Sequence, residues 1–236
     1  VYYRAHSMRT WIGSAKSVTG IRPSPHPDLL IAFQSDLMLF QLNKPVDTLP
    51  VVTLNSDPDL PRLNSILTAI GFGATSTEYL TDSDNLMAVD IYPVDPDTCV
   101  RQYSETVTVN PDTMLCAGHT SPNRDTCNGD SGGPLLDKAT GKQVGIVSFG
   151  KGCGDPDFPG VYTRVSTYTS WIHDRICELS VVPPADCPAP NAYSRKGDLG
   201  TVILSINYDN SPAQSFWRLE DDATGRTVAF QPRLPE

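Results

Sequence analysis

The residues best suited to chemistry stand in one short run, Asp125-Thr-Cys-Asn-Gly-Asp-Ser-Gly-Gly-Pro134. The glycines around Ser131 permit positive φ angles and let a substrate approach the backbone closely. In such a bend the amides of Gly129 and Ser131 can point at one spot, where they would stabilise an oxyanion. An Asn-Gly turn would explain the glycines, but it would not explain Asp130 or Cys127. We therefore predict that Ser131 is a nucleophile and that these two amides form its oxyanion hole.

The composition is that of a globular protein with one large or two modest domains. The chain has 236 residues, of which 39% are hydrophobic and 19% are charged. A net charge of −9 and a pI near 4.8 argue against nucleic acid or an anionic membrane as the main partner. No apolar run reaches the roughly 18 residues that a membrane span requires. Short β-like runs recur between 21 prolines and 17 glycines, which favours an all-β fold.

Six cysteines stand at positions 99, 116, 127, 153, 177 and 187. Their number is even, there is no Cys-x-x-Cys pair and no histidine cluster lies nearby, which favours three disulfide bonds over zinc. The cysteine pattern by itself leaves the pairing open. Disulfide bonds indicate an oxidising compartment, so we expect an extracellular, secreted protein that uses no metal and no other cofactor.

Runs that resemble strands are separated by turn residues along the first part of the chain; they cover residues 29–40, 51–54, 66–72, 87–94, 106–109, 144–149 and 161–165. One helix is predicted over residues 166–177, with Ser166 and Thr167 as its cap. Its apolar residues share one face by helical spacing: Tyr168, Trp171, Ile172 and Ile176.

Residues 180–190 are rich in proline and break regular structure, so we expect a linker there. Cys177 lies before this segment and Cys187 lies within it. A bridge between them would hold the linker to the end of the helix and stabilise the fold by roughly 3 kcal/mol in the chain-entropy model. Residues 191–236 hold about three β-like runs, which is marginal for independent folding. We predict a small β-rich module there, part of a larger sandwich.

Residues 1–179 resemble the trypsin/chymotrypsin family of serine endopeptidases. The run Asn128-Gly-Asp-Ser-Gly-Gly-Pro134 is similar to the nucleophile loop of that family. Further segments agree with the family in order: Asp36-Leu-Met-Leu-Phe-Gln-Leu42, Leu115-Cys-Ala-Gly118, and Val147-Ser-Phe-Gly-Lys-Gly-Cys153 with Pro159-Gly-Val-Tyr-Thr-Arg-Val165. The resemblance implies two antiparallel six-stranded β-barrels of the chymotrypsin type, the first incomplete, then a C-terminal helix and the β-rich appendage.

The resemblance also implies roles for single residues. Ser131 would attack a peptide carbonyl, a histidine would take its proton, and Asp36 would orient that histidine. Ser148 would hydrogen-bond to Asp36. Asp130 would pair with the new amino terminus released when a zymogen is cut, and this buried ion pair would order the oxyanion hole.

Asp125 stands six residues before Ser131, where the family has the floor of its primary specificity pocket. An acid there suits Arg or Lys, because a cation entering an apolar pocket needs a paired anion. Gly150 and Gly160 correspond to the pocket walls and leave room for a long side chain. The resemblance therefore implies a monomeric endopeptidase that cleaves proteins and peptides after Arg or Lys through an acyl-enzyme intermediate. It further implies the disulfide pairs Cys127–Cys153 and Cys99–Cys116, which leaves Cys177 to pair with Cys187.

The catalytic histidine of the family has no counterpart in the chain. The histidines are His6, His26, His119 and His173, and none follows a Thr-Ala-Ala and precedes a cysteine as in the family. We expect each of them to be structural or solvated. Because the chain begins at Val1 without a methionine or leader, we expect it to be a truncated, nearly inactive fragment of an active protease.

Two other functions stay open. The chain could be a non-catalytic binding protein on a protease fold, which the missing histidine supports and which the intact Ser131 loop and Asp125 oppose. Alternatively, residues 191–236 could bind carbohydrate through aromatic side chains, although such side chains also form cores: Tyr193, Tyr208, Phe216 and Trp217. Phe149 and Phe72 replace tryptophans usual in the family, so subsites beyond the first stay undefined.

Overall fold

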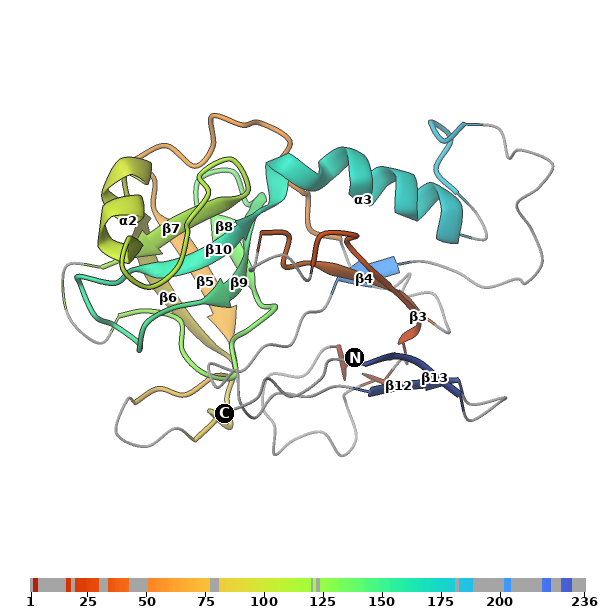
Figure 1. The fold of residues 1–236 in the computed structure, drawn as a ribbon, viewed down its shortest axis with the longest axis horizontal. Helices are drawn as coiled ribbons and strands as arrows, with labels where there is room; N and C mark the ends of the chain where they lie inside the picture. The colour runs from red at the N-terminus through yellow and green to blue at the C-terminus, as the bar shows by residue number, and fades with distance from the viewer. Residues whose placement is uncertain are drawn as a thin grey trace.

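The structure is a computed structural model in which the chain forms a β-barrel with a long helix beside it (Figure 1). It describes residues 2–3, 16–17, 20–29, 34–42, 51–76, 81–119, 121, 124–180, 183–188, 202–204, 218–221 and 226–230.

Six antiparallel strands close into the barrel in the order β10-β7-β6-β5-β8-β9. Their bounds are β5 Leu67–Gly71, β6 Met87–Pro93, β7 Met114–Gly118, β8 Pro134–Asp137, β9 Gln143–Phe149 and β10 Gly160–Arg164. Closure removes exposed strand edges. The barrel confirms the predicted fold class of antiparallel β structure. The loop between β7 and β8 carries the serine motif.

The C-terminal helix α3 spans Val165–Leu179 and so extends the predicted helix at both ends. Its predicted apolar face is the face that packs, since Tyr168 and Ile172 are buried there. The predicted cap is wrong: the residue before the helix is Arg164, which makes no capping hydrogen bond through its side chain.

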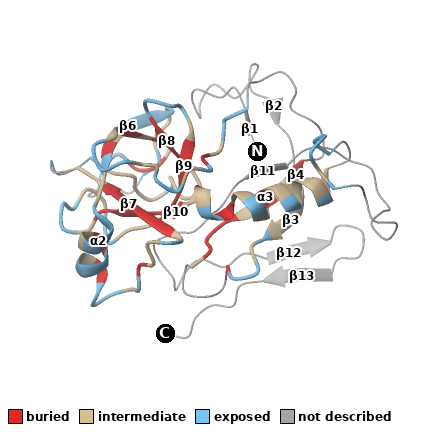
Figure 2. Ribbon diagram, turned by 90° about the horizontal axis from the view of Figure 1, so that it is seen from above, coloured by how far each residue is buried: buried red, intermediate tan, exposed pale blue. Residues whose placement is uncertain are grey.

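Strand β9 is buried along almost its whole length because both of its faces are covered. Val144 and Val147 belong to the barrel core, while Ile146 packs with the α3 cluster. Figure 2 shows the buried residues concentrated in the barrel strands. β9 is therefore the strand that joins the barrel interior to the helix.

A second helix, α2 Pro96–Tyr103, was not expected from the hydrophobic pattern. Its start is specified locally: Asp95 Oδ1 accepts a hydrogen bond from the amide of Thr98 at 3.0 Å, and proline occupies the first turn. The helix buries Tyr103 and also Cys99, which is bonded to Cys116 of β7.

Ahead of the barrel, β3 Gly20–Pro25 pairs with β4 Met38–Leu42. The predicted strand 29–40 is wrong at residues 29 and 34–35, which are turns, while residues 30–33 lie outside the described residues. Residues 51–54 and 106–109 form no strand either; within them Leu54 makes only an isolated bridge to Gln143. The described residues show a small sheet here, and a first barrel is not evident among them.

The C-terminal residues contribute three short strands, β11 Val202–Leu204, β12 Arg218–Asp221 and β13 Arg226–Phe230. β12 and β13 pair with each other, whereas β11 pairs with β4. The remaining short pair is β1 Tyr2–Tyr3 with β2 Lys16–Ser17. The aromatic residues considered for sugar binding lie outside the described residues: Tyr193, Tyr208, Phe216 and Trp217. The division of the chain at residues 180–190 stays a prediction.

Candidate active site

The loop that carries Ser131 is bent sharply by its own backbone hydrogen bonds. The amide of Gly133 donates to the carbonyl of Asp130 at 2.8 Å, and the amide of Gly132 donates to Val147 of β9 at 2.9 Å. Gly129 and Gly132 have φ angles of 92° and 78°, which residues with a Cβ rarely adopt. The bend leaves Ser131 half-buried at the barrel end rather than enclosed in the core.

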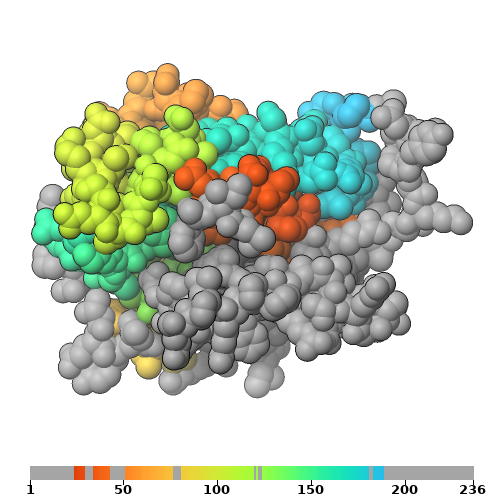
Figure 3. Space-filling view, viewed as in Figure 1, coloured from red at the N-terminus to blue at the C-terminus, as the bar shows by residue number. Residues whose placement is uncertain are grey.

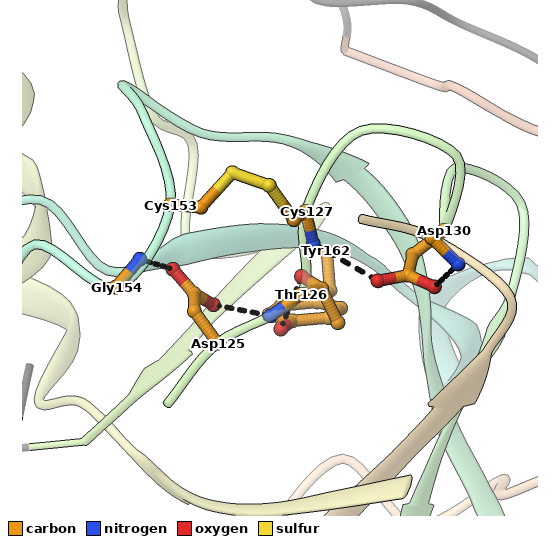
Figure 4. Close-up of a disulfide and its surroundings, with 8 residues drawn as sticks. Asp125, Thr126, Cys127, Asp130, Cys153, Gly154 and Tyr162 are labelled. Atoms are coloured by element: carbon orange, nitrogen blue, oxygen red, sulfur yellow. Dashed lines mark hydrogen bonds between the residues drawn. A yellow bond between two sulfur atoms is a disulfide. The ribbon is translucent and has the colours of Figure 1, made fainter. Parts of the chain in front are cut away.

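The Asp130 carboxylate is turned into the protein (Figure 4). Its Oδ2 accepts from the amide of Cys127 at 2.9 Å, and its Oδ1 accepts from the amide of Gly73 at 2.8 Å. Burial raises the pKa of Asp130, the two amides lower it, and the nearby carboxylate of Asp82 raises it further. A Cβ at Gly71 or Gly73 would collide with this carboxylate, so both glycines are needed for Asp130 to lie here.

The Asp125 carboxylate lies on the other side of Cys127, between two backbone amides (Figure 4). Its Oδ1 accepts from Thr126 at 2.8 Å and its Oδ2 from Gly154 at 3.0 Å. A Cβ on Gly160 would be 3.0 Å from Oδ1. Burial raises the pKa of Asp125 to about 6, although both amides act against this. Asp125 is therefore a partly desolvated anion beside Gly160, which has no side chain.

The two segments that flank Asp125, the serine loop and the segment after β9, are held together. The Cys127–Cys153 disulfide bond joins the serine loop to the segment after β9. On the far side, the buried Tyr103 hydroxyl of α2 donates to the carbonyl of Pro159 at 2.7 Å and accepts from the amide of Lys151 at 3.3 Å. The edges of Phe149 and Phe158 meet the same tyrosine ring. One tyrosine thus links both predicted pocket walls, a role that its sequence context did not indicate.

Asp36 is buried, with 1% of its surface exposed. The Ser148 hydroxyl donates to Oδ2 at 2.6 Å, while Oδ1 has no hydrogen-bond partner among the residues that the structure describes. Burial raises the pKa of Asp36 to about 6, and the Ser148 hydrogen bond lowers it. The arrangement leaves one buried carboxylate oxygen able to accept a further donor.

The segment around Asp36 is fastened to the barrel and to α3. The Thr163 hydroxyl of β10 donates to the Asp36 carbonyl at 2.8 Å, and the Tyr168 hydroxyl donates to the Gln34 carbonyl at 2.7 Å. In Figure 3 the orange-red residues of this region lie against the teal helix. Strand β10 and helix α3 therefore position the segment of Asp36 through direct hydrogen bonds.

Strand β9 brings the serine loop and Asp36 to the same place. Its neighbouring residues Val147 and Ser148 bond to Gly132 and to Asp36, respectively. Asp125 and Asp130 also line one cavity of about 210 Å³. The three acids named from the sequence, Asp36, Asp125 and Asp130, are thus gathered with the serine loop at one end of the barrel.

The described histidines lie elsewhere. His26 packs against Tyr168 and Trp171 with ring centroids 5.1 and 5.0 Å apart, and burial lowers its pKa. His119 lies beside Tyr92, and His173 lies 3.3 Å from Asp186. No described histidine bonds to Asp36, and His6 lies outside the described residues.

The six cysteines form the disulfide bonds Cys99–Cys116, Cys127–Cys153 and Cys177–Cys187. Near the last of these, His173 and both sulfur atoms come close enough for a metal site. The sulfur atoms are bonded to each other, so the group does not offer two thiolates to a metal. Within the described ranges, no helix is long and apolar enough to cross a membrane.

Comparison with known proteins agrees with this geometry. The family model described as Trypsin matches residues 1–172. Kallikrein 1-related peptidase b3 of Mus musculus is 39% identical over 150 residues, covering 62% of this chain and 55% of that protein. Kallikrein 1-related peptidase b5 of Mus musculus is 38% identical over 158 residues, 66% of this chain and 57% of that protein. Glandular kallikrein-3 (submandibular) of Rattus norvegicus is 38% identical over 144 residues, 60% of this chain and 74% of that protein.

The chain thus spans little more than half the length of the first two relatives. With its barrel, its serine loop and a family match over most of its length, the chain belongs to the trypsin family.

Proposed function

We propose that the protein is a serine endopeptidase that cleaves peptide bonds after Arg or Lys through an acyl-enzyme intermediate. The observation that carries the specificity is the environment of Asp125. Its carboxylate is half-buried, accepts hydrogen bonds from two backbone amides, and lies next to Gly160, which has no side chain. A cationic side chain is the partner that such an anion lacks.

The chemistry follows from the serine loop. Ser131 Oγ attacks the peptide carbonyl, and its oxygen becomes an oxyanion between the amides of Gly129 and Ser131. The amine then leaves with a proton, and water hydrolyses the ester formed on Ser131. Asp130 supports this step by holding the loop through Cys127 and Gly73. A new amino terminus pairing with Asp130 is part of the same proposal.

The base that moves these protons would bond to Oδ1 of Asp36, where no described residue does so. We propose that the chain by itself turns over peptides very slowly, because a histidine at this oxygen is needed to take the serine proton. Removing the histidine of a comparable triad lowers turnover by about a million-fold.

The proposal also covers where the protein is found and how its chain is divided into domains. Three disulfide bonds favour an extracellular, secreted protein. We propose a monomer with a protease domain over residues 1–179, a linker over 180–190 and a β-rich module over 191–236. The open oxygen of Asp36 equally favours one alternative, a non-catalytic protein that binds basic peptides in the Asp125 pocket.

Peptide binding without turnover tests the specificity. The Ser131→Ala variant of the whole chain is titrated with fluorescent hexapeptides that carry Arg, Lys, Met or Glu at one central position. We expect the Arg and Lys peptides to bind and the Glu peptide to fail, since Asp125 repels it. Equal binding of the Met and Arg peptides would contradict the assignment of the pocket.

A further inference from the structure

A carboxylate that the proposed mechanism does not use lies directly beside the proposed oxyanion hole. A Cβ placed on Gly129 would be 2.6 Å from Oδ1 of Asp82. The Asp82 residue is exposed to solvent. In the described part of the chain, no hydrogen bond or ion pair engages its carboxylate.

The backbone fixes the position of Asp82. It forms a bridge with Ala74, and the next residue, Ser83, donates its amide to the carbonyl of Phe72 at 2.7 Å. The amide of Ala74 in turn donates to the carbonyl of Asn128, in the serine loop, at 2.8 Å. Asp82 is therefore tied to the loop that holds the nucleophile.

Asp82 and Asp125 lie beside different residues of the serine loop, Gly129 and Thr126. Asp125 bonds to Gly154 and shares its wall with the Cys153 side, whereas Asp82 lies with Gly73, which bonds to Asp130. Figure 4 shows the Asp125 and Asp130 carboxylates on either side of Cys127. A substrate that placed one side chain against Asp125 and its carbonyl at Gly129 would have the residues next to that carbonyl close to Asp82.

The local charge favours a cation on that side. The carboxylate of Asp82 raises the pKa of Asp130, and that of Asp130 raises the pKa of Asp125. No lysine, arginine or histidine is among the causes of either shift. A negative charge beside the oxyanion hole also opposes the charge that develops there, unless a cation neutralises it.

We propose that Asp82 forms a second acidic subsite, which binds a Lys or Arg side chain at the first or second residue after the cleaved bond. This inference rests on the proposed function and narrows its substrate class to peptides with basic residues on both sides of the scissile bond. Because Asp82 is exposed, the preference is modest: an exposed ion pair corresponds to about three- to fivefold in affinity at low salt.

The test uses the whole chain with Ser131→Ala and hexapeptides of the form Ala-Ala-Arg-Xaa-Xaa-Ala, in which both Xaa are Lys, Gln or Glu. We expect the Lys peptide to bind about three- to fivefold more tightly than the Gln peptide, and the Glu peptide to bind least tightly. Adding Asp82→Asn should remove the difference. Adding Asp59→Asn, which removes the same charge at an exposed position, should keep it.

The outcomes separate the two proposals. A Lys preference that persists in Asp82→Asn overturns the Asp82 subsite. If binding depends on Asp125 but not on the charge of Xaa, the Asp82 subsite is overturned, while the proposed function is retained. If no peptide binds, or if Asp125→Asn has no effect on binding, both proposals fail. A preference that depends on Asp82 and weakens at high salt supports the subsite, because the interaction is exposed and therefore screened.

Discussion

Asp36, which is buried, and Asp125, which is half-buried, are carboxylates whose pKa values are both raised to about 6, yet their surroundings differ. Each oxygen of Asp125 accepts a hydrogen bond from a backbone amide of the barrel loops. Among the described residues, the Asp36 carboxylate accepts one hydrogen bond, from Ser148 to Oδ2, and its Oδ1 has no partner. The loops of Asp125 therefore satisfy its polar atoms locally, while Asp36 is prepared for a donor that the described structure does not supply.

From this difference we expect Asp125 to act in substrate binding and Asp36 to act in turnover. An anion held by fixed amides can receive a substrate cation without any rearrangement. A carboxylate with an open oxygen acts only through the group that it orients. We expect the barrel end to bind basic peptides while the Asp36 end limits the rate.

The largest expected effect is on the reactivity of Ser131. A fluorophosphonate probe should label this chain about a million-fold more slowly than an intact serine protease, because among the described residues no histidine bonds to Asp36 to act as the base. Labelling is followed by mass spectrometry, with Ser131→Ala as the unreactive control. Labelling at the rate of an ordinary protease would show that Asp36 already has its histidine, and the contrast between the two acids would disappear.

Next in size is the loss of the Asp125 charge. In the Ser131→Ala background, Asp125→Ser should weaken binding of Arg peptides by about a hundredfold or more, because a buried cation would lose its anion. Apolar peptides should bind relatively better. Asp157→Ser, at an exposed site, is the matched control and should change little. Unchanged Arg affinity in Asp125→Ser would refute the pocket.

The pH dependence of stability comes third. Both acids bind a proton more tightly in the folded state, at a pKa of about 6, than in the unfolded chain, at 3.8. The unfolding free energy should therefore fall as the pH rises from about 4 to 6, by up to about 3 kcal/mol for each group. Asp125→Asn and Asp36→Asn should each be more stable than the parent chain at pH 8 and gain little at pH 4. Urea unfolding at the two pH values measures this, with Asp59→Asn as the exposed control.

The smallest effect concerns the hydrogen bond from Ser148 to the Asp36 carboxylate. Ser148→Ala should lower the unfolding free energy by about 1–2 kcal/mol at pH 8, since a buried charge loses its donor. The loss should shrink at pH 4, where the carboxyl is protonated. Ser166→Ala is a suitable control, because the buried hydroxyl of Ser166 has no partner among the described residues. An equal loss at both pH values would mean that Ser148 acts by packing instead.

Much of the barrel could be predicted from the sequence. Residues 66–72, 87–94, 144–149 and 161–165 lie close to β5, β6, β9 and β10, because alternating or continuous apolar runs between turn residues report burial directly. The helix α2 was missed because its cue is a cap, Asp95 before a proline, in a segment of little apolar character. Residues 106–109 have strand-like residue types but pair with nothing, which only the tertiary structure decides.

The candidate site was predictable wherever one short motif holds several residues. The 125–134 run contains the proposed nucleophile Ser131, the proposed pocket acid Asp125 and the loop acid Asp130 together. Asp82 and Tyr103 carry no such signal, because each acts through a distant contact: Asp82 with Gly129, and Tyr103 with Pro159. Single polar residues of this kind are found only once the chain is folded.

The Tyr103 hydroxyl has a practical consequence for protein engineering. It is the link between helix α2 and the two segments that flank the Asp125 site, through Pro159 and Lys151. A change such as Tyr103→Phe would remove both hydrogen bonds without changing a residue that lines the cavity beside Asp125. Such a change in helix α2 offers a way to alter selectivity without substituting the groups that would touch a bound peptide.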